Sequence, residues 1–245
     1  MSLPAVDLLR PGRRAGGDAA ALRLRGVVKE YPGGVRALAG VDLTIERGEL
    51  VAIVGPSGSG KTTLLQIMGT LDRPTAGEVR IDGRDVAVSS DDELSALRAY
   101  RIGFVFQQFY LIDGLSALDN VANGLLYNGL APTQRRERAR VALESVQLGH
   151  RMGHLPNQLS GGERQRTAIA RAIAGEPAIV FADEPTGNLD SRTGGEIVAL
   201  LRALNSGGST LVVITHDMDV ARSFPRQVHM RDGEIVHDSA GRGAG

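Results

Sequence analysis

The sequence of 245 residues has no cysteine, and only Lys29 and Lys61 among its 28 lysine and arginine residues are lysine. The lack of cysteine excludes disulfide bonds and zinc sites built from thiolates, and it fits a reducing compartment. Acidic and basic residues are equal in number, 28 of each, so the composition does not indicate a surface that coats nucleic acid. A local basic patch remains compatible with this balance.

Long apolar runs are also missing, since no segment approaches the ~18 residues that a membrane-spanning helix needs. Residues 1–21 contain three arginines and several small residues but lack the apolar core of a signal peptide. We expect them to form a flexible tail. Residues 22–245 are long enough for one domain, and 42% of the whole sequence is hydrophobic, which is enough for a core. We therefore expect a soluble protein whose role at a membrane comes through a partner.

Three nearly continuous apolar segments, residues 50–54, 178–182 and 210–215, predict strands of a parallel sheet covered on both faces. Polar residues follow each segment directly. Because open α/β sheets bind ligands at the carboxyl ends of their strands, we expect these polar residues to meet at one edge. In chain order they are Lys61 and Thr62, Asp183 and Glu184, and His216 and Asp217.

Two further layers are expected around this sheet. Residues 22–48 and 78–88 alternate in polarity and carry turn signals, which predicts a small antiparallel β subdomain. Residues 89–171 have mainly helical patterns and interrupt the core as an inserted helical subdomain. The predicted fold class is therefore α/β, and neither an internal repeat nor a second phosphate-binding loop is found.

Helix ends within the inserted region are marked by capping residues. Ser90 with Glu93 predicts a capping box at the start of one helix. Thr133 is the expected cap of a second helix, which ends near Gly149. Arginines 135, 136, 138 and 140 lie on this second helix, and we interpret them as a solvated face, with a contact to a partner or to lipid headgroups as the alternative.

The segment after the first apolar strand, Gly-x-x-x-x-Gly-Lys-Thr, is a complete phosphate-binding loop. Its glycines let backbone N–H groups point at phosphate oxygens, Lys61 reaches the terminal phosphates, and the Thr62 hydroxyl ligates Mg²⁺. A compact ammonium on a flexible stem suits such a loop better than the planar fork of arginine. The residues predicted to hold the nucleotide here are Gly55, Pro56, Ser57, Gly58, Ser59, Gly60, Lys61, Thr62 and Thr63.

Two carboxylates follow the second apolar strand. Asp183 is the expected Mg²⁺ ligand, directly or through water, and Glu184 orients and polarises the attacking water. A solvated acidic turn would be an equal alternative if the pair stood alone, but the phosphate-binding loop favours the functional interpretation. A carboxylate rather than an amide at position 184 indicates a competent hydrolase.

The run Leu-Ser-Gly-Gly-Glu-Arg-Gln-Arg, residues 159–166, has two compatible interpretations. Ser160 and Glu163 form a predicted capping box in front of a helix with an apolar face. A helix start with two glycines also offers free N–H groups and a positive dipole end to an anion. The phosphate-binding loop already accounts for a phosphate bound to its own chain. An anion bound at this helix start would therefore be a different one.

In this order, the phosphate-binding loop, the run at 159–166 and the acidic strand end resemble the ATP-binding cassette (ABC) ATPases, from about Leu22 to about Val236. The resemblance implies a RecA-like P-loop NTPase core, ATP and Mg²⁺ as ligands, and two copies of the chain that close around ATP. In that family, residues matching Ser160, Gly161, Gly162 and Glu163 cover the γ-phosphate of ATP bound to the opposite subunit. Glutamate at position 163 departs from the more widespread glutamine.

The same resemblance assigns roles to four isolated residues. Gln107 contacts Mg²⁺ or the attacking water, with Gln108 as an adjacent rival, and His216 contacts the γ-phosphate. Tyr31 stacks on adenine, and Asp190 lies in a loop that meets the partner subunit. Taken alone, each residue has an ordinary alternative, such as a surface amide, an exposed histidine or a strand-end tyrosine.

Three stretches, residues 101–109, 159–172 and 182–190, resemble the ATPases of bacterial lipoprotein-release, macrolide-efflux and cell-division systems. This implies a peripheral subunit at the cytoplasmic face of the cell membrane that drives a separate integral membrane permease, of the export or mechanotransmission type. The alternative is a regulatory ATPase that signals to an envelope or cell-division complex without moving a solute. Tyr110 and Asp113 depart from the subgroup, which leaves the permease and the cargo open.

Overall fold

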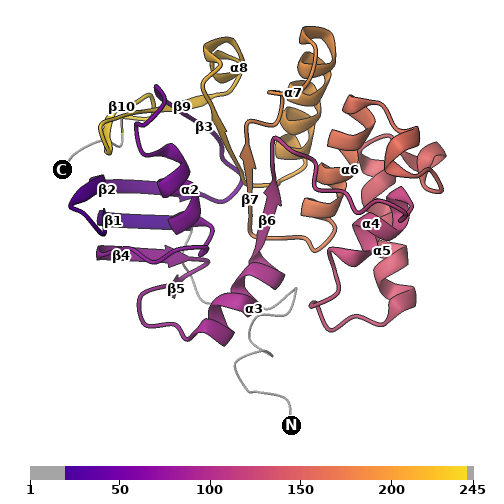
Figure 1. Ribbon diagram of the computed structural model, residues 1–245, viewed down its shortest axis with the longest axis horizontal. Coiled ribbons are helices and arrows are strands. Elements are labelled where there is room, and N and C mark those ends of the chain that lie inside the picture. The colour runs from indigo at the N-terminus through magenta and orange to yellow at the C-terminus, as the bar shows by residue number, and fades with distance from the viewer. Residues whose placement is uncertain (1–19, 242–245) are drawn as a thin grey trace.

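The protein, a computed structural model, is described over residues 20–241 (Figure 1). Residues 1–19 of the expected tail lie outside this range, and the first strand begins at Ala20. The strands are β1 (Ala20–Tyr31), β2 (Val35–Glu46), β3 (Leu50–Val54), β4 (Ala76–Ile81), β5 (Arg84–Asp85), β6 (Ile102–Val105), β7 (Ile179–Asp183), β8 (Leu211–Thr215), β9 (Arg226–Arg231) and β10 (Glu234–Asp238). The helices are α2 (Lys61–Met68), α3 (Asp91–Arg101), α4 (Ala117–Asn123), α5 (Pro132–Ser145), α6 (Gly161–Ile173), α7 (Ser191–Ser206) and α8 (Met218–Arg222), with 3₁₀ turns η1 (Gly149–Arg151) and η2 (Pro156–Gln158).

A six-stranded sheet in the order β10-β9-β3-β8-β7-β6 forms the centre of the molecule, and only β10 runs antiparallel to its neighbour. Alternate residues of β3 enter two different cores. Val51 and Ile53 pack on one face of the sheet, and Ala52 and Val54 pack on the other. Since side chains of a strand alternate between faces, this division explains why the strand is an unbroken apolar run.

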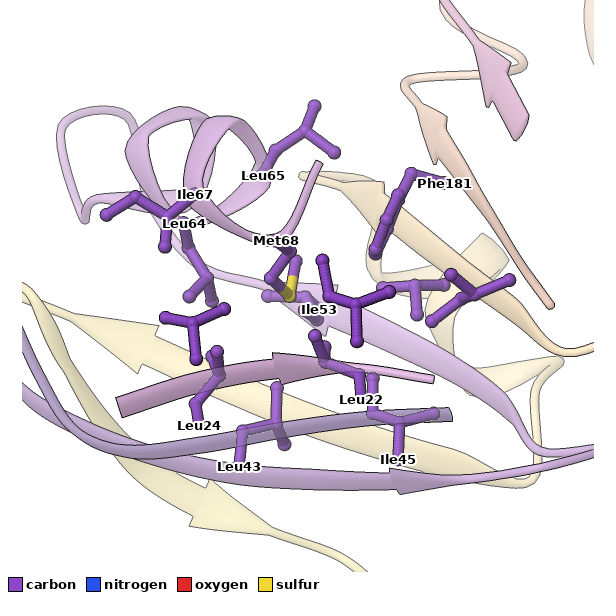
Figure 2. Packing of buried hydrophobic residues seen from close by; sticks show 14 of the residues in the cluster. Leu22, Leu24, Leu43, Ile45, Ile53, Leu64, Leu65, Ile67, Met68 and Phe181 are labelled. Atoms are coloured by element: carbon purple, nitrogen blue, oxygen red, sulfur yellow. The ribbon is translucent and has the colours of Figure 1, made fainter. Parts of the chain in front are cut away.

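The second sheet, in the order β2-β1-β4-β5, is antiparallel as predicted, and α2 is packed between the two sheets. Figure 2 shows Leu22, Leu24 and Leu43 of this sheet facing Leu64 and Met68 of α2. All five side chains are buried. Each contributes roughly 1.5–3 kcal/mol to stability by leaving water, so this core fixes α2 and with it the loop that precedes the helix.

Helices α4, α5 and α6 form the lobe on the right of Figure 1. The predicted capping box at Ser90 and Glu93 is confirmed, because the Ser90 hydroxyl accepts from the Glu93 N–H and the Glu93 carboxylate accepts from the Ser90 N–H. The predicted cap at Thr133 is wrong. The cap residue is Ala131, two residues earlier, and helix α5 starts with Pro132, whose fixed φ suits the first helical position.

Residues 102–105 belong to the six-stranded sheet as β6, although they lie within the range expected to be mainly helical. Strand β6 pairs in parallel with β7, so this short apolar segment crosses from α3 into the central sheet before the lobe begins. Within residues 20–241, none of the helices has the length and apolar character needed to cross a membrane.

Candidate functional site

The phosphate-binding loop connects the end of β3 to the start of α2. At Gly60 the backbone is left-handed, with φ 96°, and a Cβ there would lie 2.5 Å from the Ala37 carbonyl oxygen. A side chain at Gly55 would collide with the Met230 carbonyl of β9. A hydrogen bond also holds the loop to the turn after β9, because the Gly233 N–H donates to the Ser59 carbonyl at 3.1 Å. The tight packing leaves room for glycine alone at both ends of the loop.

Lys61 is held by the loop that it completes. Its ammonium donates to the carbonyls of Gly55 and Pro56 at 2.7 and 2.8 Å. Burial lowers the pKa of Lys61, while the negative charges of Glu184 and Asp183 act in the opposite direction. The lysine therefore lies between loop carbonyls and two carboxylates, in position to exchange the carbonyls for phosphate oxygens.

Glu184 is constrained through both its backbone and its side chain. Its backbone is left-handed, with φ 47°, an uncommon conformation for a residue with a side chain. One carboxylate oxygen accepts from the Thr215 hydroxyl at 3.1 Å, and the other accepts from the His216 N–H at 3.0 Å and lies 2.5 Å from His216 Nδ1. Backbone and side-chain contacts with the end of β8 therefore fix the direction of this carboxylate.

Asp183 is the last residue of β7 and lies beside Ile214 of β8. Burial is the main cause that raises the pKa of Asp183, the charge of Glu184 raises it further, and Lys61 opposes both. A carboxylate that is desolvated and close to another carboxylate is the kind of oxygen ligand that a small divalent cation stabilises.

Gln107 reaches the site from the segment after β6. Its amide Nε2 donates to Asn188 Oδ1 at 3.3 Å, and Asn188 Nδ2 donates to the Gln107 carbonyl at 2.9 Å. Gly187 allows this approach, because a Cβ there would lie 2.8 Å from Gln107 Nε2. Gln107 lines the cavity described next and its rival Gln108 does not.

These elements surround a cavity of about 640 Å³ at the carboxyl edge of the sheet. Ala37 and Ile214 line the cavity and were not predicted, and neither was the contact of Thr215 with Glu184. Apolar residues of this kind carry no sequence signal of a site. The predicted residues that line the cavity are Ser57, Gly58, Gly60, Lys61, Thr62, Thr63, Gln107, Asp183, Glu184 and His216.

Three other predicted residues, Ser160, Asp190 and Tyr31, do not line this cavity. Ser160 caps α6, where its hydroxyl accepts from the Glu163 N–H at 3.2 Å, so the predicted capping box is confirmed. Asp190 caps α7 through the Thr193 N–H. Tyr31 ends β1, with the Lys29 ammonium 5.0 Å from its ring centre. The roles predicted for Ser160, Asp190 and Tyr31 stay predictions.

The donor set of the cavity fits a nucleotide phosphate with a divalent cation. The start of α2 offers free backbone N–H groups and the positive end of a helix dipole beside the Lys61 ammonium. The Thr62 hydroxyl and the Asp183 carboxylate are oxygen ligands of the kind that Mg²⁺ prefers. Phosphate and cation chemistry can therefore meet at this edge of the sheet.

Comparison with known proteins assigns the family. A sequence model described as ABC transporter matches residues 38–187, more than half of the chain. The chain is an ABC transporter ATP-binding protein by family. It is 49% identical to the ABC transporter ATP-binding protein YknY of Bacillus subtilis, with 90% of this chain and 97% of that protein aligned.

A second relative of this ABC protein is much longer. The macrolide export ATP-binding/permease protein MacB 1/2 of Paracoccus denitrificans is 50% identical over 89% of this chain, which spans only 33% of that protein. Among solved structures, the dimeric, post-hydrolysis ATP-binding cassette MJ0796, bound to ADP and Pi, matches with a TM-score of 0.79 and 47% identity. That alignment covers 91% of this chain and 100% of MJ0796, which supports the predicted fold class throughout.

Replacement of Lys61 by alanine should weaken ATP binding. The ammonium is the only lysine charge in the cavity, and hydrogen bonds to a charged group contribute about 1.5–3 kcal/mol, which predicts a loss of roughly 10- to 100-fold in affinity. Isothermal titration calorimetry with ATP and Mg²⁺ measures this directly. The exposed Arg202→Gln variant on α7 serves as the control and should bind ATP normally. Unchanged affinity in Lys61→Ala would remove this lysine from the site.

Asp183→Asn should increase thermal stability at neutral pH while impairing Mg²⁺-dependent ATP binding. The folded pKa of Asp183 is raised, so its contribution to stability is present below the ordinary value of 3.8 and is lost as pH rises through the raised folded pKa. Asparagine has no carboxyl group to ionise, so the variant does not lose this stability as the pH rises. Melting curves recorded below pH 3.8 and at pH 7 test the direction of this pH dependence. A variant that melts at a lower temperature than the wild type at pH 7 would contradict it.

Proposed function

We propose that the chain is the ATP-hydrolysing subunit of an ABC transporter, which dimerises around ATP with Mg²⁺ and drives a separate membrane permease. The observation that carries the proposal is the Glu184 carboxylate, fixed by Thr215 and His216 at the edge of a cavity that also contains Lys61. A directed carboxylate beside a phosphate-binding loop suits attack of water on a terminal phosphate.

Each residue has a defined part in the proposed hydrolysis. Lys61 and the N–H groups of the loop neutralise charge on the terminal phosphates, and Glu184 accepts the proton of the attacking water. The Nδ1 atom of His216 forms a hydrogen bond with the Glu184 carboxylate and so holds that carboxylate in place. Thr62 and Asp183 would hold Mg²⁺, which supplies positive charge where negative charge develops.

The need for two copies follows from Ser160. The start of α6 has the free N–H groups and dipole of an anion site, yet Ser160 and Glu163 lie outside the cavity of their own chain. A second copy could present this helix start to the terminal phosphate. The dimeric state named for MJ0796 supports such an arrangement.

A permease partner is supported by the relatives and by exposed apolar side chains. MacB 1/2 is named an ATP-binding/permease protein, and this chain aligns with a third of it. On this chain, Tyr110, Ile112, Leu126 and Tyr127 are between 48% and 80% exposed. Tyr110 and Tyr127 line adjoining cavities between α3 and the helical lobe, where we propose that the permease docks.

Purification of the tagged full-length chain from the membranes of its source organism tests the partner. We expect a permease with several membrane spans to co-purify and to stimulate ATP hydrolysis. A short-span regulator of cell-wall enzymes in its place would support the regulatory function instead. Absence of any ATP hydrolysis, with or without the membrane partner, would contradict the proposal.

A further inference from the structure

The start of α6 carries a negative charge of its own. Ser160 caps the helix, and the Glu163 carboxylate in the first turn accepts from the Ser160 N–H at 2.8 Å. Glutamine can take the same place in a capping box, so the cap does not require this charge. The hydrogen bond from Ser160 is the main cause that lowers the pKa of Glu163, and Arg151 lowers it further against the effect of burial. The Glu163 side chain is therefore ionised at neutral pH.

This charge opposes the anion-binding role proposed for the helix start. Free N–H groups and the positive end of the dipole attract an anion to the N-terminus of a helix. A carboxylate in the first turn repels a phosphate that is brought to the same place. The Glu163 side chain is only 21% exposed, so solvent screens its charge incompletely. Binding of a second copy's phosphate here requires a positive charge that compensates Glu163.

Arg151 supplies this positive charge. It is the last residue of η1, the 3₁₀ turn between α5 and α6. Its Nε donates to one oxygen of the Glu163 carboxylate at 2.8 Å, while the other oxygen accepts from the Ser160 N–H. The two oxygens are thus divided between the guanidinium and the helix cap. Together, Arg151 and Glu163 add no net charge to the start of α6.

The surrounding segment holds Arg151 in place. Its Nη1 lies 3.1 Å from His154 Nε2, and since a guanidinium has only donors, the histidine nitrogen is the acceptor. The His154 N–H donates to the Arg151 carbonyl at 2.9 Å. The carbonyls of His154 and Met152 accept from the N–H groups of Ala117 and Leu118, at 2.8 and 3.0 Å. Arg151 is therefore part of a segment that is attached to the start of α4.

We propose that Arg151 is a positioning residue for ATP hydrolysis. By neutralising the Glu163 carboxylate, it keeps the start of α6 attractive to the terminal phosphate of ATP bound to a second copy. Arg151 does not line the nucleotide cavity of its own chain, so it acts through Glu163 and through the other subunit's site. The inference rests on the proposed function and adds a residue to the two-copy site.

Four proteins test the charge compensation. The Arg151–Glu163 pair is neutral in the wild type and in the double variant Arg151→Gln/Glu163→Gln, negative in Arg151→Gln alone, and positive in Glu163→Gln alone. Phosphate release with saturating ATP and Mg²⁺ should fall by about 10-fold in Arg151→Gln, because one uncompensated charge beside a phosphate is enough for such a change. The double variant should return to nearly the wild-type rate, and Glu163→Gln should be at least as fast as the wild type.

Further measurements separate this role from a general effect on the fold. ATP affinity of the monomer, measured by calorimetry, should be the same in all four proteins. With Glu184→Gln added to each, the ATP concentration for half-maximal dimer formation should rise by about 10-fold only where Arg151→Gln stands alone.

Two single variants provide the controls. Arg151→Lys keeps the positive charge and should retain most of the rate. Arg140→Gln removes another ion-paired arginine of the same lobe, the partner of Glu137 and Glu144 on α5, and should hydrolyse ATP normally.

The outcomes against the proposal are distinct. A double variant as slow as Arg151→Gln would show that the guanidinium supports the shape of the lobe and not the charge balance. Equal rates in Arg151→Gln and the wild type would show that the charge of Glu163 needs no compensation. Either result overturns the role of Arg151 and leaves the proposed function intact. A wild type that hydrolyses no ATP, with or without the membrane partner, would contradict both.

Discussion

Glu184→Gln should stop ATP hydrolysis and allow the chain to accumulate as an ATP-bound dimer. The amide preserves the shape of the side chain but cannot take a proton from water, and loss of a general base costs about 10²- to 10⁴-fold in rate. Phosphate release in the presence of Mg²⁺ measures the rate. Size-exclusion chromatography with and without ATP measures the dimer, which should appear only with ATP.

Two comparisons make this result specific. Glu234→Gln, an exposed substitution in β10, should retain the wild-type rate and should not trap a dimer. Removal of Mg²⁺ with EDTA should abolish hydrolysis in the wild type. A Glu184→Gln protein that releases phosphate at the wild-type rate would show that another group activates the water. If the variant remained monomeric, repetition with the permease would distinguish a need for that partner from failure of the two-copy site.

Ser160→Arg should abolish hydrolysis and dimer closure while ATP binding remains largely intact. Ser160 lies outside the cavity of its own chain, so the phosphate-binding loop is unchanged by the substitution. The bulky side chain would instead block the start of α6 where the second copy's ATP is expected. Calorimetry with ATP, phosphate release and chromatography on one preparation separate binding, hydrolysis and closure.

Ser90→Arg provides a matched control, because Ser90 and Glu93 form the same kind of capping box at the start of α3. Both substitutions remove an N-cap, at a cost of about 0.5–2 kcal/mol in stability. Only the Ser160 variant should lose ATPase activity. Equal losses in the two variants would mean that the effect comes from destabilisation, and normal hydrolysis by Ser160→Arg would contradict the two-copy model.

Much of the fold could be predicted because the strongest sequence patterns have local physical causes. Strands β3, β7 and β8 are buried on both faces, which requires the uninterrupted apolar runs that were recognised. Ser90 and Ser160 bond to N–H groups three residues away, so the capping residues lie close together in the sequence. The phosphate-binding loop is likewise one continuous segment.

Other features depend on contacts between distant segments. Strand β6 has only four residues, and it is a strand because it pairs with β7. Paired residues of the two strands, such as Ile102 and Ile179, are 77 positions apart in the sequence. The contact of Gln107 with Asn188 and that of Thr215 with Glu184 also join remote segments. No local pattern encodes such pairs. At α5, Thr133 was an acceptable cap by type, and Pro132 moved the helix start because of its fixed φ.

The order of strands has a consequence for synthesis on the ribosome. β3 leads into the phosphate-binding loop, yet both of its neighbours, β8 and β9, are translated far later. At about 5–20 residues per second, β3 waits roughly 10–35 s for β9 to emerge. Through that time the backbone N–H and C=O groups along both edges of β3 lack their final partner strands. The sheet that supports the phosphate-binding loop is therefore complete only after β9 has been made.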